Sequence, residues 1–483
     1  MRKWFKRLLI SFLILTGVLL VVVVIAWKWA QHKYLSPDGI VRELEKSYNV
    51  RAQVAGTSID PFKKPATLVI KGLRLFPRDA VADSGVSLSQ RPPIPDASAK
   101  LAGDSISMEL DLRNMLWRFV RGKSVDLDVE KFVADGIDLR LKVNENGNTD
   151  LVALFDKPDI VNGKPNPKKI KKPGQKNNFT MKGKGLAELS GNLPLLIGVA
   201  GVRNTRLYIQ RDDEKMSYLL EHLNFQLEDV DLSSEDIANH NHLVVRSSYQ
   251  MTVQDMAKNE MLAKATMDVH APLRPFDPVT TLFNPQGKID VLVNKGSQFQ
   301  RKTLDAALEL YRVSQEGKKH PKPSVGGKPD EDVVNEIKSM GMNLQSLEVG
   351  GELLSDMRLQ IKTEQGGYSL ENEPMIAFKN FTLKAFPGSS YNEKTNDYTL
   401  DWQVTLDDQA TQEVQQGLPK YLEKKGGIVG KFFAPDLFKQ IQDDQGRVSL
   451  KIRNWSTGGK DDWRPLFEGS LFKKLESFGI KIK

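Results

Sequence analysis

The chain contains no cysteine among its 483 residues. This absence excludes disulfide bonds, thiol catalysis, iron–sulfur clusters and zinc sites with cysteine ligands. Histidine is scarce, with six residues, and the one close pair is His240 and His242. On a strand the two rings would face one side and bind a metal together with Asp236, but an exposed turn is the favoured interpretation. The sequence predicts no metal site and no cofactor.

The motifs of common enzyme classes are missing. The sequence has no G-x-x-x-x-G-K-[ST], no H-E-x-x-H, no G-x-S-x-G and no Rossmann glycine pattern. Ser470 and Lys473 fit S-x-x-K, yet the companion S-D-N and K-T-G motifs are absent. We therefore expect a protein that is not an enzyme, and an unrecognised envelope hydrolase is the third and least favoured alternative.

A strong excess of one charge is lacking in the body of the chain. Lysine and arginine number 69 against 61 acidic residues, which gives a net charge of +8. Six of these positive charges lie near the N-terminus, at Arg2, Lys3, Lys6, Arg7, Lys28 and Lys33. The remainder carries about +2, so the charge gives no reason to expect a nucleic-acid partner.

One long apolar run is present, at residues 8–27, and it contains no charge. At 1.5 Å per residue, these twenty residues span about 30 Å as a helix, which is the thickness of a bilayer core. The predicted membrane anchor is made of Leu8, Leu9, Ile10, Leu13, Leu15, Leu19, Val22, Ile25 and Trp27. Basic residues precede the run, so the positive-inside rule places the N-terminus in the cytoplasm and the body outside. A cleaved signal peptide is the competing interpretation, but the run is long and residues 26–30 make a poor cleavage site.

Alternation of apolar and polar residues dominates the exported part. It occurs at 125–129, 137–143, 207–209, 223–232, 357–361, 400–406 and 448–452. A period of two is typical of strands with one buried and one solvated face. Asn146-Gly147 and Asp212-Asp213 separate such runs and predict turns. The fold class is therefore mainly β, with an elongated antiparallel sheet.

A weak internal repeat supports a sheet that grows by repeated units. Residues 135–142 match residues 203–210 at an offset of 68, and residues 70–75 and 378–383 begin alike. Gly72, Gly136, Asn204 and Asn380 occupy equivalent positions, where a left-handed turn or bulge would separate one strand from the next.

A few helices are predicted beside the sheet. Ser36 as N-cap and Pro37 in the first turn begin a helix that ends near Tyr48. Amphipathic helices are expected at 299–312 and 330–340. Apolar residues at helical spacing in 467–478 predict a C-terminal helix, which would either seat on a membrane or partner, or plug the open end of the sheet. The second alternative is favoured.

Two segments rich in Lys, Pro and Gly, 157–184 and 317–332, are expected to be exposed loops. Anionic lipid or cell-wall polymer is an alternative partner for the first. The predicted organisation is thus a cytoplasmic tip and anchor at 1–34, a β-region at 35–155, a linker or loop at 156–185, and a second β-rich region at 186–483.

The N-terminal third resembles a known family. The anchor, the helix that leads into 48–54, and the segments 105–116, 121–129, 136–141 and 146–151 look like the N-terminal region of the AsmA-like proteins, relatives of TamB. The pattern is a strand, a helical step ending at Gly122-Lys123, two further strands and a G-x-N turn. The resemblance covers residues 1 to about 155 and is faint beyond 186. It implies an inner-membrane protein of the Gram-negative envelope, with a curled β-groove that takes part in phospholipid transport to the outer membrane.

The residues themselves leave two functions open. A groove would be lined by the apolar positions of its strands: Ile137, Leu139, Leu141, Val143, Leu223, Phe225, Leu227, Trp402, Val404 and Leu406. Such a lining would shelter phospholipid or glycolipid acyl chains, at about 0.8 kcal/mol per CH₂ removed from water. Alternatively, helices fill this face as an ordinary core and the protein is a periplasmic scaffold for envelope assembly. An outer-membrane or periplasmic partner protein is expected in either case.

Overall fold

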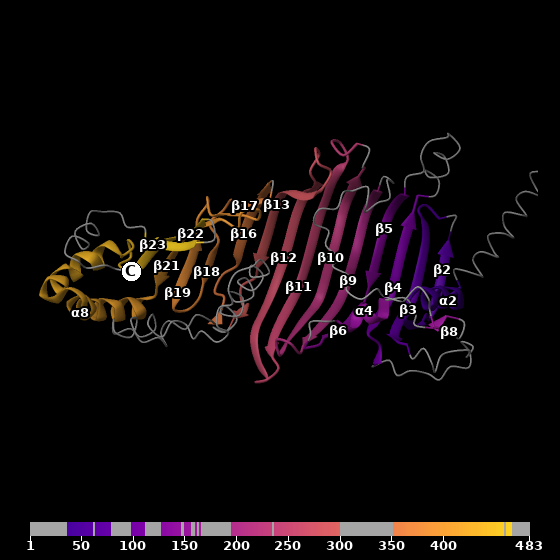
Figure 1. Ribbon diagram of the computed structural model, residues 1–483, viewed down its shortest axis with the longest axis horizontal. Coiled ribbons are helices and arrows are strands. Elements are labelled where there is room, and N and C mark those ends of the chain that lie inside the picture. The colour runs from indigo at the N-terminus through magenta and orange to yellow at the C-terminus, as the bar shows by residue number, and fades with distance from the viewer. Residues whose placement is uncertain are drawn as a thin grey trace, which may run out of the picture. The chain divides into compact units, whose positions relative to one another are not determined.

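The computed structural model describes residues 36–60, 63–78, 98–111, 127–145, 149–155, 160–161, 164–165, 195–233, 236–299, 351–364, 366–457 and 460–465. The described residues are mainly β, with three helices among them, as Figure 1 shows. They belong to two compact units, one formed by Met1–Phe179 and Leu196–Lys215 and the other by Thr180–Leu195 and Met216–Lys483. Strand β9 therefore falls with the first unit, although it follows the predicted linker.

The first unit is a sheet with two short helices. Its elements are α2 (Pro37–Ser47), β1 (Val50–Gln53), β2 (Gly56–Asp60), β3 (Ala66–Pro77), β4 (Leu101–Leu110), β5 (Leu127–Asp135), β6 (Asp138–Val143), α4 (Asp150–Phe155), β7 (Ile160–Val161), β8 (Lys164–Pro165) and β9 (Leu195–Arg211). β1 and β2 both pair with β3, β3 pairs with β4, and β4 pairs with both β5 and β6.

The predicted helix after Ser36 is confirmed. Ser36 Oγ accepts a hydrogen bond from the amide of Gly39 at 3.1 Å, and Pro37 is the first helical residue. This side-chain acceptor satisfies one of the amides that a helix N-terminus leaves unpaired. Val41 of α2 and Leu154 of α4 are buried in one cluster with Val50, Leu73 and Leu75. Both helices therefore cover the same apolar face of the sheet.

The prediction of a purely antiparallel sheet is wrong at one pair of strands. β6 and β9 run parallel, with Leu139 beside Leu207 and Leu141 beside Ile209. The segment 144–194 separates these strands, and a connection of this length lets the chain return to the same edge before the next strand begins. The offset between partners is 68, the same as that of the internal repeat. The two copies of the repeat therefore lie side by side.

The left-handed positions predicted from the repeat are confirmed at three of four places. Gly72, Gly136 and Asn204 have φ values of +60°, +65° and +48°. β3 and β9 continue through Gly72 and Asn204, so these residues are irregularities within a strand, while Gly136 separates β5 from β6. Asn380 lies in a bend between β18 and β19 instead.

The second unit is an antiparallel sheet with one long helix. Its elements are β10 (Met216–Leu232), β11 (Asn241–Asp255), β12 (Glu260–Phe276), β13 (Phe283–Val293), β14 (Gln298–Phe299), β15 (Gly351–Glu352), β16 (Met357–Glu364), β17 (Gly367–Leu370), β18 (Met375–Ala377), β19 (Phe381–Ala385), β20 (Ser390–Asn392), β21 (Tyr398–Leu406), α8 (Asp408–Gln440), β22 (Ser449–Thr457) and β23 (Lys460–Pro465). The main order is β10, β11, β12, β13, β16, β17, β20, β21, β22 and β23, with β19 also paired to β21.

The predicted strands are confirmed where the structure describes them, and each of the seven alternating segments overlaps a strand. Asp212-Asp213 lie in a turn, as expected. Asn146-Gly147, the helices at 299–312, 330–340 and 467–478, and most of both Lys/Pro-rich segments lie outside the described residues. So does the predicted anchor at 8–27. Within the described ranges, no helix has both the length and the hydropathy to cross a membrane.

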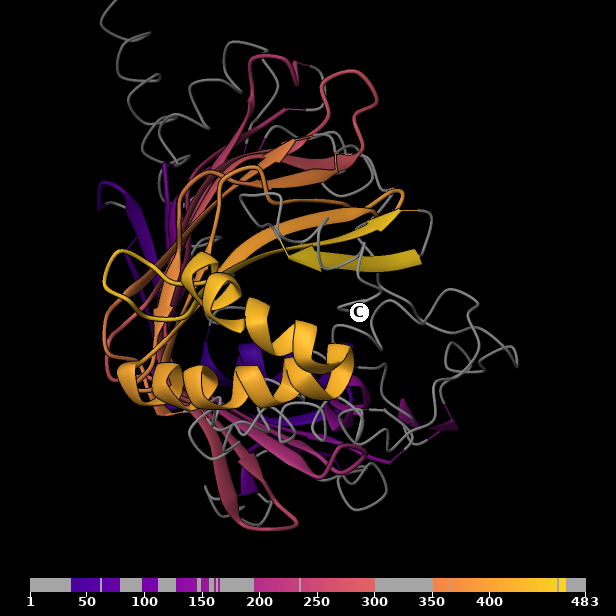
Figure 2. The same cartoon turned by 90° about the vertical axis from the view of Figure 1, so that its left-hand side faces the viewer.

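Helix α8 is the principal element that the sequence patterns did not predict. Asp407 caps it, accepting a hydrogen bond from the amide of Ala410 at 2.8 Å. Pro419 and Pro435 lie inside it and remove backbone hydrogen bonds. Figure 2 shows that the helix is bent. Residues near both of its ends, among them Val414 and Leu437, are buried in a single cluster with the sheet.

Candidate functional site

One face of the second unit's sheet is apolar across several strands. Directly opposed residues of neighbouring strands project from the same face. The register gives three such rows: Met267, Val293 and Met357; Val269, Val291 and Leu359; and Ile289, Ile361 and Leu370. A continuous apolar face of this kind must either be covered by other elements or be available to a ligand.

Strand β10 keeps its apolar residues on this face by means of two bulges. His222 and Asp229 have positive φ values of +51° and +50°, and the register with β11 shifts by one residue at each place. A bulge inserts one residue and so reverses the alternation. Leu220 consequently opposes Met251. Phe225 comes five residues later, a spacing that would put it on the other face of an unbroken strand, yet it opposes Ser247 on the same face of β11.

Helix α8 covers one part of the apolar face. Ala410, Val414, Leu418 and Leu422 recur at four-residue spacing, and all four are buried in the cluster described above. The same cluster takes in Phe378, Phe381, Leu406 and Val448, with Met267, Val291, Met357, Leu383 and Val404 packed against it. This part of the face is therefore an ordinary core.

Beyond α8 the same face opens into a cavity of about 510 Å³. On β16, β19 and β21, the boundary between the α8 cluster and the cavity falls between two residues of the same face. Met357, Leu383 and Val404 pack against the cluster. The residues two positions away on the same strands, Leu359, Ala385 and Trp402, line the cavity. The cluster around α8 thus forms one end wall of the cavity.

The cavity is lined by large apolar side chains and by a row of three tyrosines. Leu359, Ile361, Leu370, Leu400 and Trp402 are the large apolar residues of the lining. Tyr368, Tyr391 and Tyr398 are register partners on three neighbouring strands, and the rings of the first two stack with centroids 6.1 Å apart. The lining is completed by Ser369, Ala385, Ser389, Ser390, Thr399 and Asn454. None of these described lining residues is charged.

Trp402 is fixed in the cavity wall by its polar atom. Its indole Nε1 donates a hydrogen bond to Asn454 Oδ1 at 2.6 Å. Because the donor is satisfied, the ring can present its apolar surface without leaving a polar group unpaired. Leu400, two residues away on the same face, is 41% exposed. An apolar ligand would cover this leucine.

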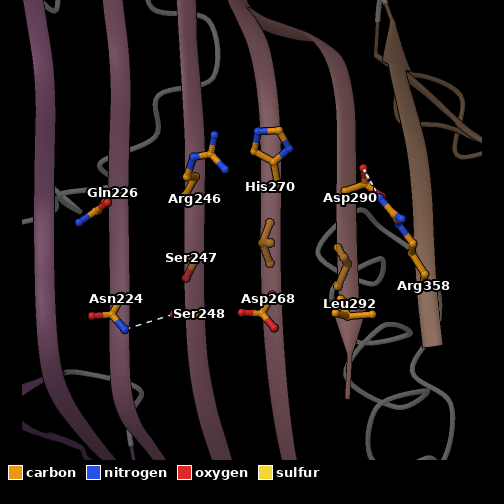
Figure 3. A pocket seen from close by; sticks show the side chains of 12 residues that line it. Asn224, Gln226, Arg246, Ser247, Ser248, Asp268, His270, Asp290, Leu292 and Arg358 are labelled. Carbon is orange, nitrogen blue, oxygen red and sulfur yellow. Dashed lines mark hydrogen bonds and ion pairs between the residues drawn. The ribbon is translucent and has the colours of Figure 1, made fainter. Parts of the chain in front are cut away.

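The opposite face of the sheet is polar. Figure 3 shows Arg246, His270 and Asp290 side by side on three strands, around a hollow of about 650 Å³. Arg358 Nε donates to Asp290 Oδ1 at 3.0 Å, and this hydrogen bond lowers the pKa of Asp290 and raises the pKa of Arg358. Arg246 pairs in turn with Glu228 at 2.6 Å. These paired charges are typical of a solvated sheet face.

The structure places the predicted lining of β6 in the first unit. Leu139 lies in a row with Leu75, Leu101 and Leu207. Ile137 is buried over Gly103, where a Cβ would approach its Cδ1 to 2.7 Å. Leu141 and Val143 are half-buried beside Ile209 and Arg211.

The other predicted lining residues belong to the second unit. Leu223 and Leu227 of β10 are half-buried, and Phe225 is 38% exposed. On β21 the three predicted residues divide, because Trp402 lines the cavity while Val404 and Leu406 pack in the α8 cluster.

Leu359, Ile361 and Leu370 were not among the predicted lining residues. The alternation of residues 357–361 predicts the strand of Leu359 and Ile361 and the face on which both lie, but not the neighbouring strand β17, which carries Leu370. The four-residue spacing of Ala410, Val414, Leu418 and Leu422 after the N-cap Asp407 is a signal for the first half of α8. Gly417, Pro419 and Gly426-Gly427 disfavour a helix and so weaken this signal.

His240 and His242 lie on either side of the start of β11. His240 is exposed at the end of the turn before β11, as predicted, while His242 lies in the strand itself. His240 Nδ1 lies 2.9 Å from Asp231 Oδ1, and this hydrogen bond raises the pKa of His240. Within the described part of the chain, His, Asp and Glu residues nowhere form a group of three suited to a metal ion.

No family model, no curated protein and no solved structure matches the chain.

Proposed function

We propose that the protein is a non-enzymatic, AsmA-like protein of the Gram-negative envelope that holds lipid acyl chains against the apolar face of its β-sheet. In this proposal residues 8–27 anchor it in the inner membrane, with the N-terminus in the cytoplasm and the body in the periplasm. Phospholipid or glycolipid is its cargo, and its role is lipid transport in outer-membrane assembly.

The observation that carries this proposal is the uncharged cavity beyond α8. A volume of about 510 Å³ is in the range of small-molecule sites, which are lined mainly by apolar and aromatic groups. Burying a chain here recovers about 0.8 kcal/mol for each CH₂ that leaves water. The main barrier to moving a lipid is exposure of its tails, so no nucleophile or general base is required.

A second function is supported by α8 itself. The helix already fills part of the apolar face with its own side chains, as a core would. In this alternative the protein carries no lipid and acts as a periplasmic scaffold that binds other proteins.

Lipid extraction and native mass spectrometry of the full-length protein, purified from a host with a double-membrane envelope, distinguish the two. The test variant is Leu400→Asp, which places a carboxylate at the exposed leucine of the cavity. The matched control is Leu282→Asp, in the loop between β12 and β13. The two leucines are 41% and 40% exposed, so the folding cost of the new charge is similar.

If the cavity holds acyl chains, lipid will co-purify with the wild-type protein and with Leu282→Asp, and Leu400→Asp will lose most of it. A well-folded wild-type protein without lipid would favour the scaffold. Equal lipid in all three proteins would show that the lipid binds elsewhere.

A further inference from the structure

The cavity borders the α8 cluster at one end and a polar row of tyrosines at the other. On β16, β19 and β21 the residues next to the lining, Met357, Leu383 and Val404, are packed in the α8 cluster. The tyrosine row lies across β17, β20 and β21 on the other side of Trp402. Tyr398 and Trp402 are four residues apart on β21, which is a distance of about 13 Å along an extended strand.

This arrangement orients any amphiphile that enters. The apolar side chains Leu359, Leu400 and Trp402 lie towards the α8 end, and the hydroxyl groups of Tyr391 and Tyr398 lie at the other. Tyr391 donates its hydroxyl proton to Asn396 Oδ1 at 3.2 Å, so this end of the cavity is polar. The described residues of the lining supply no cation to neutralise a phosphate, so a charged head group is best left in water.

We propose that the cavity takes a single acyl chain, tail first, and that helix α8 sets the greatest chain length that fits. This inference rests on the proposed function, because it assumes that acyl chains are the ligand. The tail end meets Met357, Leu383 and Val404, which are half-buried against the α8 cluster, and a longer chain would have to displace them and disturb the core behind them. Displacement of that kind is unfavourable, because cores resist the insertion of even one or two methylenes.

Two substitutions change the length of the cavity in opposite directions. Ala385→Leu enlarges a lining residue beside the end wall and leaves less room for the tail. Leu418→Ala removes three carbons from the α8 cluster and lets the residues packed against it move back, which leaves more. Leu73→Ala is the matched control, because Leu73 and Leu418 are 9% and 8% exposed and Leu73 packs in the separate core of the first unit.

The experiment measures displacement of a dansylated fatty acid from the full-length protein in amphipol by saturated fatty acids of eight to eighteen carbons. Affinity for the wild type should rise by up to about fourfold for each added methylene and then stop rising. Ala385→Leu should move this limit to shorter chains by about three methylenes. Leu418→Ala should move it to longer chains by a similar amount, and Leu73→Ala should leave it unchanged.

Each other outcome is decisive. If affinity rises through eighteen carbons without a limit, α8 does not set the length, although acyl chains still bind and the proposed function stands. If the limit exists but Ala385→Leu leaves it in place, the wall lies elsewhere and this inference is wrong. If no fatty acid displaces the probe from the wild type, both the inference and the proposed function fail. Should Leu418→Ala not fold, Ala385→Leu alone still decides.

Discussion

Replacing Gly136 with alanine should destabilise the first unit by about 2 to 3 kcal/mol. Gly136 separates β5 from β6 with a φ of +65°, a conformation that costs a residue with a side chain about 1 to 2 kcal/mol. The new Cβ would also lie 2.6 Å from Cγ and 2.9 Å from Cβ of Asp104. Asp104 is exposed and its carboxylate can rotate away, but its Cβ moves only with the backbone, which adds about 1 kcal/mol.

Hydrogen exchange of the full-length protein, followed by mass spectrometry, measures this change in the amides around the substitution. The amide of Gly136 donates to the carbonyl oxygen of Arg203 at 3.0 Å, and the amide of Arg206 donates to that of Ile137 at 2.6 Å. Both hydrogen bonds join the two copies of the internal repeat. Their exchange should accelerate by a factor of about 30 to 150 if these amides open together with the unit.

Two further variants separate the causes. Gly56→Ala is the control, since its Cβ would meet nothing within 4 Å, and we expect no destabilisation. Measured in an Asp104→Gly background, so that the cost of the new glycine in β4 cancels, Gly136→Ala should lose the steric part, about 1 kcal/mol, and keep the backbone part. Unchanged protection of β6 in Gly136→Ala would refute the reasoning, because it would mean that the left-handed conformation is not required there.

Two other predictions concern single side chains. Asp231→Asn should return the pKa of His240 towards its ordinary value of 6.5, since the hydrogen bond to Asp231 is the main cause of the raised pKa. In the wild type this pair contributes stability that is complete below pH 6.5 and is lost as pH rises through the raised pKa. An NMR titration in which the pKa of His240 is unchanged by Asp231→Asn would contradict the assignment. Leu422 is fully buried, and Leu422→Ala should lower the free energy of unfolding by about 2 to 5 kcal/mol and speed amide exchange throughout α8. Unchanged amide exchange in α8 would mean that the helix does not unfold cooperatively with the sheet.

Patterns within one stretch of chain predicted the local structure well. The alternation of residues 400–406 gave a strand because period two follows from the pleat of a single strand. Ser36 and Pro37 gave the start of a helix because a cap acts on amides only two or three residues away. Gly72, Gly136 and Asn204 gave left-handed positions, since backbone sterics depend on the residue itself.

The tertiary structure decided what these local elements form together. The offset of 68 was visible in the sequence, but the parallel pairing of β6 with β9 was not, because it depends on the path of the intervening chain. In the same way, alternation placed Trp402, Val404 and Leu406 on one face of β21, and only the packing of α8 separated a cavity wall from a core. An apolar side chain has the same sequence signature whether a helix covers it or a ligand does, and the physical difference lies in residues far away along the chain.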